Sequence, residues 1–121
     1  MFAPIFSICS KDSEVLSYLG DDPVRLFAFG DAPQNTQTPY AVWQMVSGLP
    51  STFINEVPDI DSYVVQVDVY SDSMSEARDT AKAIRNAVEP HANITAWRGE
   101  FTDTTTLLRR YSFDITWFVN R

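Results

Sequence analysis

The chain has 121 residues, with 16 acidic side chains, 9 basic side chains and a single cysteine. This length suits one domain with its own core, while one cysteine excludes an internal disulfide and a cysteine-based zinc site. The formal net charge of −7 argues against a protein that collects nucleic acid through its phosphates. The apolar run near the amino terminus is too short for a membrane span or an export signal, so no membrane contact is expected.

The first predicted element is helical. Apolar residues between Pro4 and Leu19 fall near one face of a helix. Ser10 and Asp12 are good helix caps, so this region is predicted as one helix or as two short ones. A short strand is expected over Val24 to Phe29, and the polar, turn-rich residues 30–39 are predicted as a loop.

The next strand is predicted over Tyr40 to Ser47, where apolar side chains alternate on both faces. Because Val42 lies on the face opposite to that of its apolar neighbours, the pattern predicts that both faces are covered. Residues 48–62 are rich in turn-forming residues and are expected to form a loop, with Phe53 and Ile54 as its apolar centre. A loop of this length in a small domain usually contacts a partner or stays mobile.

A strand followed by an amphipathic helix is predicted over residues 63–89. Alternate residues from Tyr63 to Tyr70 are apolar, which indicates a strand with one buried face. Ser73 and Glu76 have the spacing of a capping box, and apolar residues at helical spacing continue until Pro90.

The chain then ends in two strands, over residues 93–101 and 107–119, joined by a polar connection as in a hairpin. The predicted order is therefore helix, strand, strand, strand, helix, strand, strand. This order indicates an α+β fold with a single, mainly antiparallel sheet and helices packed on one face. No repeat or linker interrupts residues 1–121, so one domain is expected.

Residues that could carry catalysis are few. Cys9 and His91 form the only nucleophile and base pair that the composition allows, and such a pair must lie at hydrogen-bond distance. Cys9 lies on the apolar side of the first helical region, where a small buried side chain is the commoner role. Asp59 and Asp61 resemble an oxygen-ligand pair for a divalent cation, but a solvated loop is the preferred interpretation. No catalytic residue, metal or cofactor is predicted.

A small basic patch is possible near the last hairpin. Arg109 and Arg110 lie at the start of the final strand, and Arg98 lies on the strand before it. Ion pairing of these arginines with nearby acids is the preferred alternative. The candidate acids are Glu100, Asp103 and Asp114.

Seven short runs of residues share an order and spacing with a known family. They are Ala32-Pro33-Gln34, Pro39-Tyr40-Ala41-Val42-Trp43-Gln44, Val46-Ser47-Gly48, Val65-Gln66-Val67-Asp68-Val69-Tyr70, Glu76-Ala77-Arg78, Ile84-Arg85-Asn86-Ala87-Val88 and Arg109-Arg110-Tyr111-Ser112-Phe113-Asp114-Ile115. Together they resemble the tail completion or tail terminator proteins of long-tailed phages. The resemblance covers nearly the whole chain and departs in residues 48–62 and 100–108, which are expected to be adapted to a particular partner.

The resemblance implies a structural virion protein that forms a ring, often a hexamer, at the head-proximal end of the tail tube. There it would end tube growth and form the joint to the head connector. Its implied partners are further copies of itself, the tail tube protein and the head–tail connector protein, while genome DNA passes through without specific binding. The implied location is the tail of the virion, with the host cytoplasm as the place of assembly.

Candidate contact residues follow from the apolar and basic positions described above. The candidates for subunit or tail-tube interfaces are Phe53, Ile54, Val42, Arg109 and Arg110. Asp59 and Asp61 are candidates for acids that face the lumen of the ring, where negative charge would keep DNA from adhering.

Two other classes of function stay open at this stage. One is a small cytosolic α+β enzyme, for example a hydrolase that uses acidic residues or the Cys9 and His91 pair, which would need a concave site with convergent polar groups. The other is a generic protein-interaction module. Stoichiometry separates the module from the phage protein, because a module has no reason to close a ring.

Overall fold

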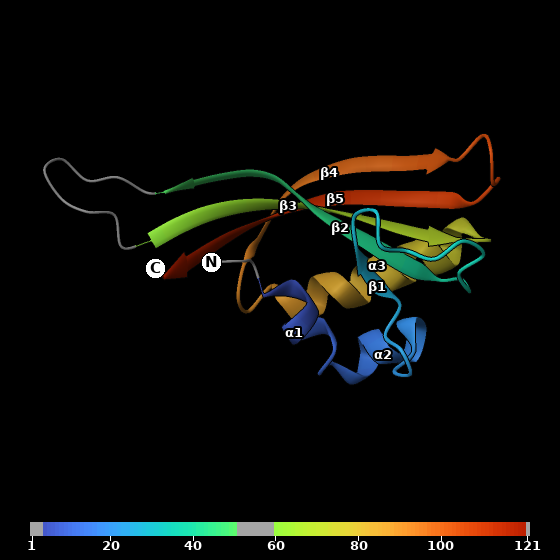
Figure 1. Cartoon of the computed structure of the whole chain (residues 1–121), viewed down its shortest axis with the longest axis horizontal. Coiled ribbons are helices and arrows are strands. Elements are labelled where there is room, and N and C mark those ends of the chain that lie inside the picture. Colours follow the sequence, from blue (N-terminus) through green and yellow to red (C-terminus); the bar gives the residue numbers. More distant parts are fainter. Residues whose placement is uncertain (1–3, 51–59, 121) are drawn as a thin grey trace, which may run out of the picture.

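The computed structural model describes residues 4–50 and 60–120, which form three helices and five strands (Figure 1). In chain order the elements are α1 (Ile5–Cys9), α2 (Ser13–Leu19), β1 (Leu26–Ala28), β2 (Tyr40–Pro50), β3 (Ile60–Ser71), α3 (Met74–Val88), β4 (Asn93–Thr102) and β5 (Arg109–Asn120). The predicted element order is confirmed, and the amino-terminal helical region forms two helices.

The five strands form one sheet in the order β1-β2-β3-β5-β4. β1 pairs with β2 in parallel, and all other neighbours are antiparallel. The predicted α+β class with a mainly antiparallel sheet is therefore confirmed. The parallel pair arises because residues 29–39 carry the chain back to the starting end of β1 before β2 begins.

All three helices pack on one face of the sheet (Figure 1). The period-two pattern of β3 and β5 is the reason, because it places alternate apolar side chains on this face. The buried apolar residues of these two strands are Val65, Val67, Val69, Phe113, Ile115 and Trp117. From the other side α3 contributes Ala77, Ala81, Ile84 and Val88, which recur at helical spacing.

Asp12 divides the amino-terminal helical region. One oxygen of its carboxylate, Oδ1, accepts hydrogen bonds from the backbone N–H groups of Glu14 and Val15, at 3.0 Å each. These bonds satisfy donors that the first turn of α2 would otherwise leave unpaired. The capping signal in the sequence thus marks the start of a second helix.

The cap of α3 differs from the predicted capping box. Ser73 Oγ accepts from the backbone N–H of Glu76 at 3.1 Å, as predicted. The Glu76 carboxylate, however, accepts from the hydroxyl of Ser71 at 2.6 Å, and the same hydroxyl accepts from the backbone N–H of Ser73 at 3.3 Å. The Ser71 hydroxyl therefore lies between the Glu76 carboxylate and the backbone N–H of Ser73, two groups that bond directly in a standard capping box.

Strands β2 and β3 are longer than the sequence pattern predicts. Residues 48–62 were expected to form a loop, but β2 continues to Pro50 and β3 begins at Ile60, with Gly48 opposite Tyr63. The prediction failed because backbone pairing continues through Gly and Pro positions where side-chain alternation is lost. The paired ends of β2 and β3 (residues 49–50 and 60–62), with residues 118–120 of β5, extend past the helices and are called the arm (Figure 1).

The expectation that β2 is covered on both faces is wrong for the residues that the structure describes. Ala41 is buried and Trp43 packs against the core on the helix-bearing face. Val42 points to the opposite face, where no described helix packs, and stays half-buried. An apolar residue on a second face therefore does not by itself imply a second layer from the same chain.

Candidate assembly surfaces

The described residues do not support catalysis by Cys9 and His91. Cys9 is fully buried, and burial, with a further contribution from the Asp12 charge, raises the pKa of its thiol to about 12. The thiol therefore stays protonated near neutral pH, when a nucleophile would need the thiolate. His91 is exposed in the turn after α3. Within the described part of the chain, no hydrogen bond joins the two side chains.

Metal ligands do not cluster in residues 4–50 and 60–120. No group of three or more His, Cys, Asp or Glu side chains in these ranges is arranged to hold a metal ion. In the same ranges, no helix is long and apolar enough to cross a membrane.

Arg109 and Arg110 point to opposite faces of the sheet, because neighbouring residues alternate along a strand. Arg109 is exposed, and its Nη1 donates to Thr102 Oγ1 at 2.8 Å. Arg110 is half-buried on the uncovered face, with its guanidinium 4.7 Å from the centre of the Phe101 ring. Burial raises the pKa of Tyr70 there, and the neighbouring Arg110 opposes that rise. The two arginines therefore belong to two different surfaces.

Arg98, the other arginine of the last hairpin, forms an ion pair. Arg98 Nε and Nη2 donate to the two carboxylate oxygens of Asp114 at 2.8 and 2.9 Å. Glu100 pairs with Arg78 of α3 instead, and this hydrogen-bonded contact lowers the pKa of the Glu100 carboxyl. Asp103 accepts hydrogen bonds within its own turn. The ion-pairing interpretation is thus confirmed for Arg98.

The uncovered face of the sheet carries polar and aromatic side chains in fixed positions. Asp68, opposite Val42 in the β2–β3 register, is 7% exposed. Its Oδ1 accepts from Ser112 Oγ at 2.6 Å and from Gln66 Nε2 at 3.2 Å. These bonds compensate for the loss of water around a buried carboxylate. The face is therefore ordered without a covering layer.

The arm and the adjoining end of β2 expose apolar side chains that the core does not use. Met45 and Val46 are exposed at the bulge of β2, and Phe118 of β5 is 59% exposed. Exposed apolar side chains of this size, on or beside a projecting element, are typical of contact surfaces. Met45 and Val46 lie within the two-sided apolar stretch Tyr40 to Val46 that the sequence marks for contacts, whereas Phe118 is not among the predicted contact residues. The available signal was Phe118, an aromatic residue on the outward face of the last predicted strand.

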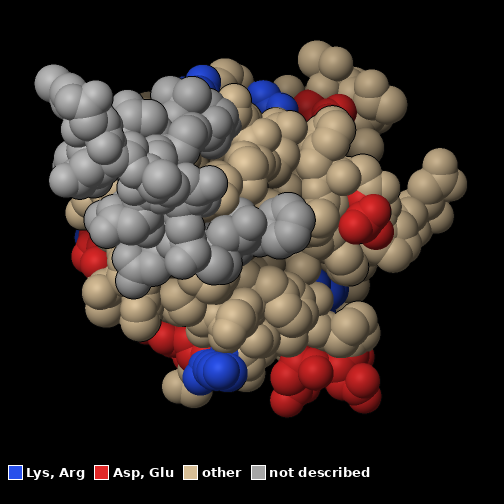
Figure 2. Space-filling model, turned by 60° about the vertical axis from the view of Figure 1, so that its left-hand side comes forward, with Lys and Arg blue, Asp and Glu red and all other residues tan. Residues whose placement is uncertain are grey.

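Charged side chains are unevenly distributed between the two halves of the chain. Residues 1–72 carry ten acidic and two basic side chains, whereas residues 73–121 carry six acidic and seven basic ones. On the face shown in Figure 2, Lys and Arg atoms and Asp and Glu atoms occur at both the upper and the lower margin, and the largest group of Asp and Glu atoms lies at the lower margin.

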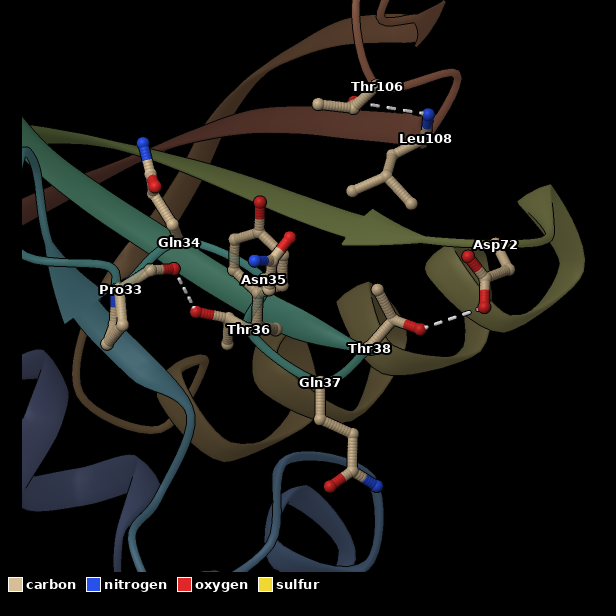
Figure 3. A pocket seen from close by; sticks show the side chains of 10 residues that line it. Pro33, Gln34, Asn35, Thr36, Gln37, Thr38, Asp72, Thr106 and Leu108 are labelled. Carbon is tan, nitrogen blue, oxygen red and sulfur yellow. Dashed lines mark hydrogen bonds between the residues drawn. The ribbon is translucent and has the colours of Figure 1, made fainter.

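A cavity of about 750 Å³ lies beside the loop before β2 (Figure 3). Residues 33–38 form one wall, with Tyr40, Asp72 and the turn before β5 around it. Thr38 Oγ1 donates to Asp72 Oδ2 at 3.1 Å, which fixes the loop against the end of β3. Among the described residues that line the cavity, Asp72 is the only carboxylate, and none of them offers a second acid or base for hydrolysis.

The other predicted contact residues lie at or beyond the limits of the described structure. Phe53, Ile54 and Asp59 fall outside the described residues. The backbone of Asp61 lies in β3, opposite Val119 of β5, and its side chain is not described. Of the predicted contact residues with a described side chain, Val42 and Arg110 share the uncovered face.

The described residues form an α+β fold with exposed apolar and charged side chains on its surface. The family model of tail completion protein gp17 matches residues 3–120, and the chain belongs to this family of structural phage tail proteins. The resemblance seen in the sequence is thereby confirmed.

The fold is similar to that of a chain in the solved structure described as the virion of a native gene transfer agent (GTA) particle. That likeness has a TM-score of 0.71 and covers 97% of this chain and 92% of that chain, at 10% sequence identity. No curated protein matches this chain.

Proposed function

We propose that the protein, as one domain over residues 1–121, closes a ring on the head-proximal end of the tail tube. The ring, a hexamer in the form that the resemblance implies, ends tube growth and forms the joint to the head connector. The observation that carries this proposal is the family match over residues 3–120. The chain reaches the virion from the host cytoplasm, where the tail is assembled.

The arm is the surface that best suits contact with the tail tube. It projects beyond the helices and, with the adjoining end of β2, exposes Met45, Val46 and Phe118. Phe53 and Ile54 lie in the segment that joins β2 to β3 in the sequence, so they belong to the same proposed surface. Val42, Arg109 and Arg110 remain candidates for contacts with a neighbouring subunit or with the connector.

Capping of tail tubes tests the proposal directly. Purified protein mixed with purified tail tubes is expected to form a closed ring at one end of each tube, visible by electron microscopy, and to stop elongation when tube protein is added. Mass measurement across concentration gives the state of the free protein, which can be monomeric if the tube acts as template. A protein that leaves tube ends bare and elongation unchanged contradicts the proposal.

Genome passage gives a second expectation. Asp59 and Asp61 are proposed to face the lumen, where like charge keeps the DNA backbone from adhering. Replacing both with lysine is expected to slow DNA release from completed particles, measured by dye access to released DNA. Unchanged release would mean that these acids face solvent outside the lumen.

A further inference from the structure

One edge of the molecule forms a basic groove between α3 and β4. Arg78, Lys82 and Arg85 recur on one face of α3 and line a groove of about 420 Å³ together with Trp97 of β4. Trp97 is 48% exposed, and the Arg85 guanidinium lies 5.7 Å from the centre of its ring. These four residues are called the basic edge.

The charges of the basic edge are only partly balanced within the subunit. Arg78 pairs with Glu100, and Arg85 Nε lies 3.0 Å from Glu89 Oε1. Lys82 is exposed and has no ion pair among residues 4–50 and 60–120. An exposed tryptophan beside such a cation is suited to a partner surface that offers both negative charge and an apolar group.

The opposite edge of the sheet has these complementary features. Asp21 and Asp22 precede β1, Asp31 follows it, and all three are exposed. Phe29, directly after β1, is 69% exposed. These four residues are called the acidic edge. None of the three acids has an ion pair within the described part of the chain.

Arg25, the one basic residue next to β1, does not neutralise the acidic edge. Its Nε donates to the backbone carbonyl of Pro39 at 3.0 Å, and its Nη2 donates to that of Tyr18 at 2.9 Å. The guanidinium is therefore committed to holding the loop and α2 in place. The negative charge beside β1 stays available to a partner.

The two edges lie at opposite ends of the sheet, because the strand order is β1-β2-β3-β5-β4. The acid-rich residues 1–72 supply β1, β2 and β3, while the more basic residues 73–121 supply β5 and β4. We propose that the basic edge of one subunit binds the acidic edge of the next copy of the chain. This inference rests on the proposed ring and names the surfaces that close it.

A contact between two different surfaces of the same chain is heterologous, and it repeats until the rotation between subunits closes a ring. The contact runs through side chains more than through added strand pairing. β4 has register shifts between Ile94 and Ala96 and between Trp97 and Gly99, and such bulges interrupt the row of free backbone groups. β1 offers only three residues.

Charge reversal tests the contact. The basic-edge variant carries Arg78→Glu and Lys82→Glu, and the acidic-edge variant carries Asp21→Lys and Asp22→Lys; all four side chains are exposed, so the fold should persist. Each variant alone brings like charges together, and we expect its subunit association to weaken about 100-fold or more. Ring formation on tail tubes is counted by electron microscopy, and circular dichroism reports folding.

Mixing the two variants gives the decisive readout. In an equimolar mixture the two variants can alternate around the ring, and every contact then joins opposite charges. Rings with an even number of subunits are therefore expected to return. A chain that carries all four substitutions should also form rings by itself. Lys11→Glu is the matched control, since this exposed residue lies between α1 and α2, outside both edges, and it should assemble normally.

Three results would overturn the inference. Normal rings from either variant alone would show that the edges do not meet. Failure of both the mixture and the fourfold variant to restore rings, with folded protein, would show that charge complementarity is not the cause. Loss of duplex DNA binding in the basic-edge variant, with normal rings, would assign the groove to nucleic acid. If the unaltered protein forms no ring with tubes, the proposed function itself is wrong. If the unaltered protein forms rings and one of the results above is seen, only the contact between the two edges is wrong.

Discussion

Replacing Phe113 with alanine is expected to lower the free energy of unfolding by about 3–5 kcal/mol, the usual cost of removing a fully buried phenylalanine. Phe113 is 0% exposed in β5, lies opposite Val67 of β3, and its ring centre is 5.4 Å from that of Trp97. Truncation would leave a cavity between the sheet and α3 that rigid neighbours cannot close. Urea unfolding followed by circular dichroism measures the loss.

Phe118 provides the matched control on the same strand. It is five positions further along β5 and is 59% exposed, so Phe118→Ala should change the free energy of unfolding by less than about 0.5 kcal/mol. Equal losses for Phe113→Ala and Phe118→Ala would contradict the burial of β5 described above. A small loss for Phe113→Ala would show that the site relaxes around the smaller side chain.

Elements with strong periodicity were predictable from the sequence. The alternation in β3 and β5 placed their buried faces correctly, because each buried face needs an unbroken row of apolar side chains. Asp12 and Ser73 marked helix starts for the same local reason, since capping involves only neighbouring residues. These features depend on short stretches of chain, so the local sequence is sufficient to predict them.

Features that depend on distant partners were not predictable. The extension of β2 to Pro50 depends on pairing with β3, which local composition does not reveal. The parallel alignment of β1 and β2 depends on the route of residues 29–39 in space. Arg109 and Arg110 looked like one patch in the sequence, but strand alternation separated them.

The contact surfaces were only partly predictable for a similar reason. The unequal charge of the two halves of the chain is visible in the sequence. Only the strand order turns this inequality into opposite edges of one sheet, because β5 lies between β3 and β4. The sequence alone therefore does not show that Lys82 and Asp22 lie at opposite edges of the same sheet.

Replacing Phe118 with aspartate is expected to reduce capping of tail tubes about 100-fold while leaving the subunit folded. Burying a carboxylate in an apolar contact without a partner costs several kcal/mol, and about 1.4 kcal/mol corresponds to each factor of ten in affinity. Phe118 is exposed in the free subunit, so the same change costs little in folding. Binding to tubes is measured by co-sedimentation, and the folded state by thermal unfolding.

Leu107 is the matched control for the direction in which the subunit faces the tube. It is 71% exposed in the turn between β4 and β5, at the end of the sheet away from the arm (Figure 1). Its positive φ of 61° is a conformation that aspartate tolerates better than leucine, so Leu107→Asp should fold well. If the arm contacts the tube, Leu107→Asp retains capping and Phe118→Asp loses it. The reverse result would mean that the β4–β5 turn, and not the arm, is the surface that contacts the tube.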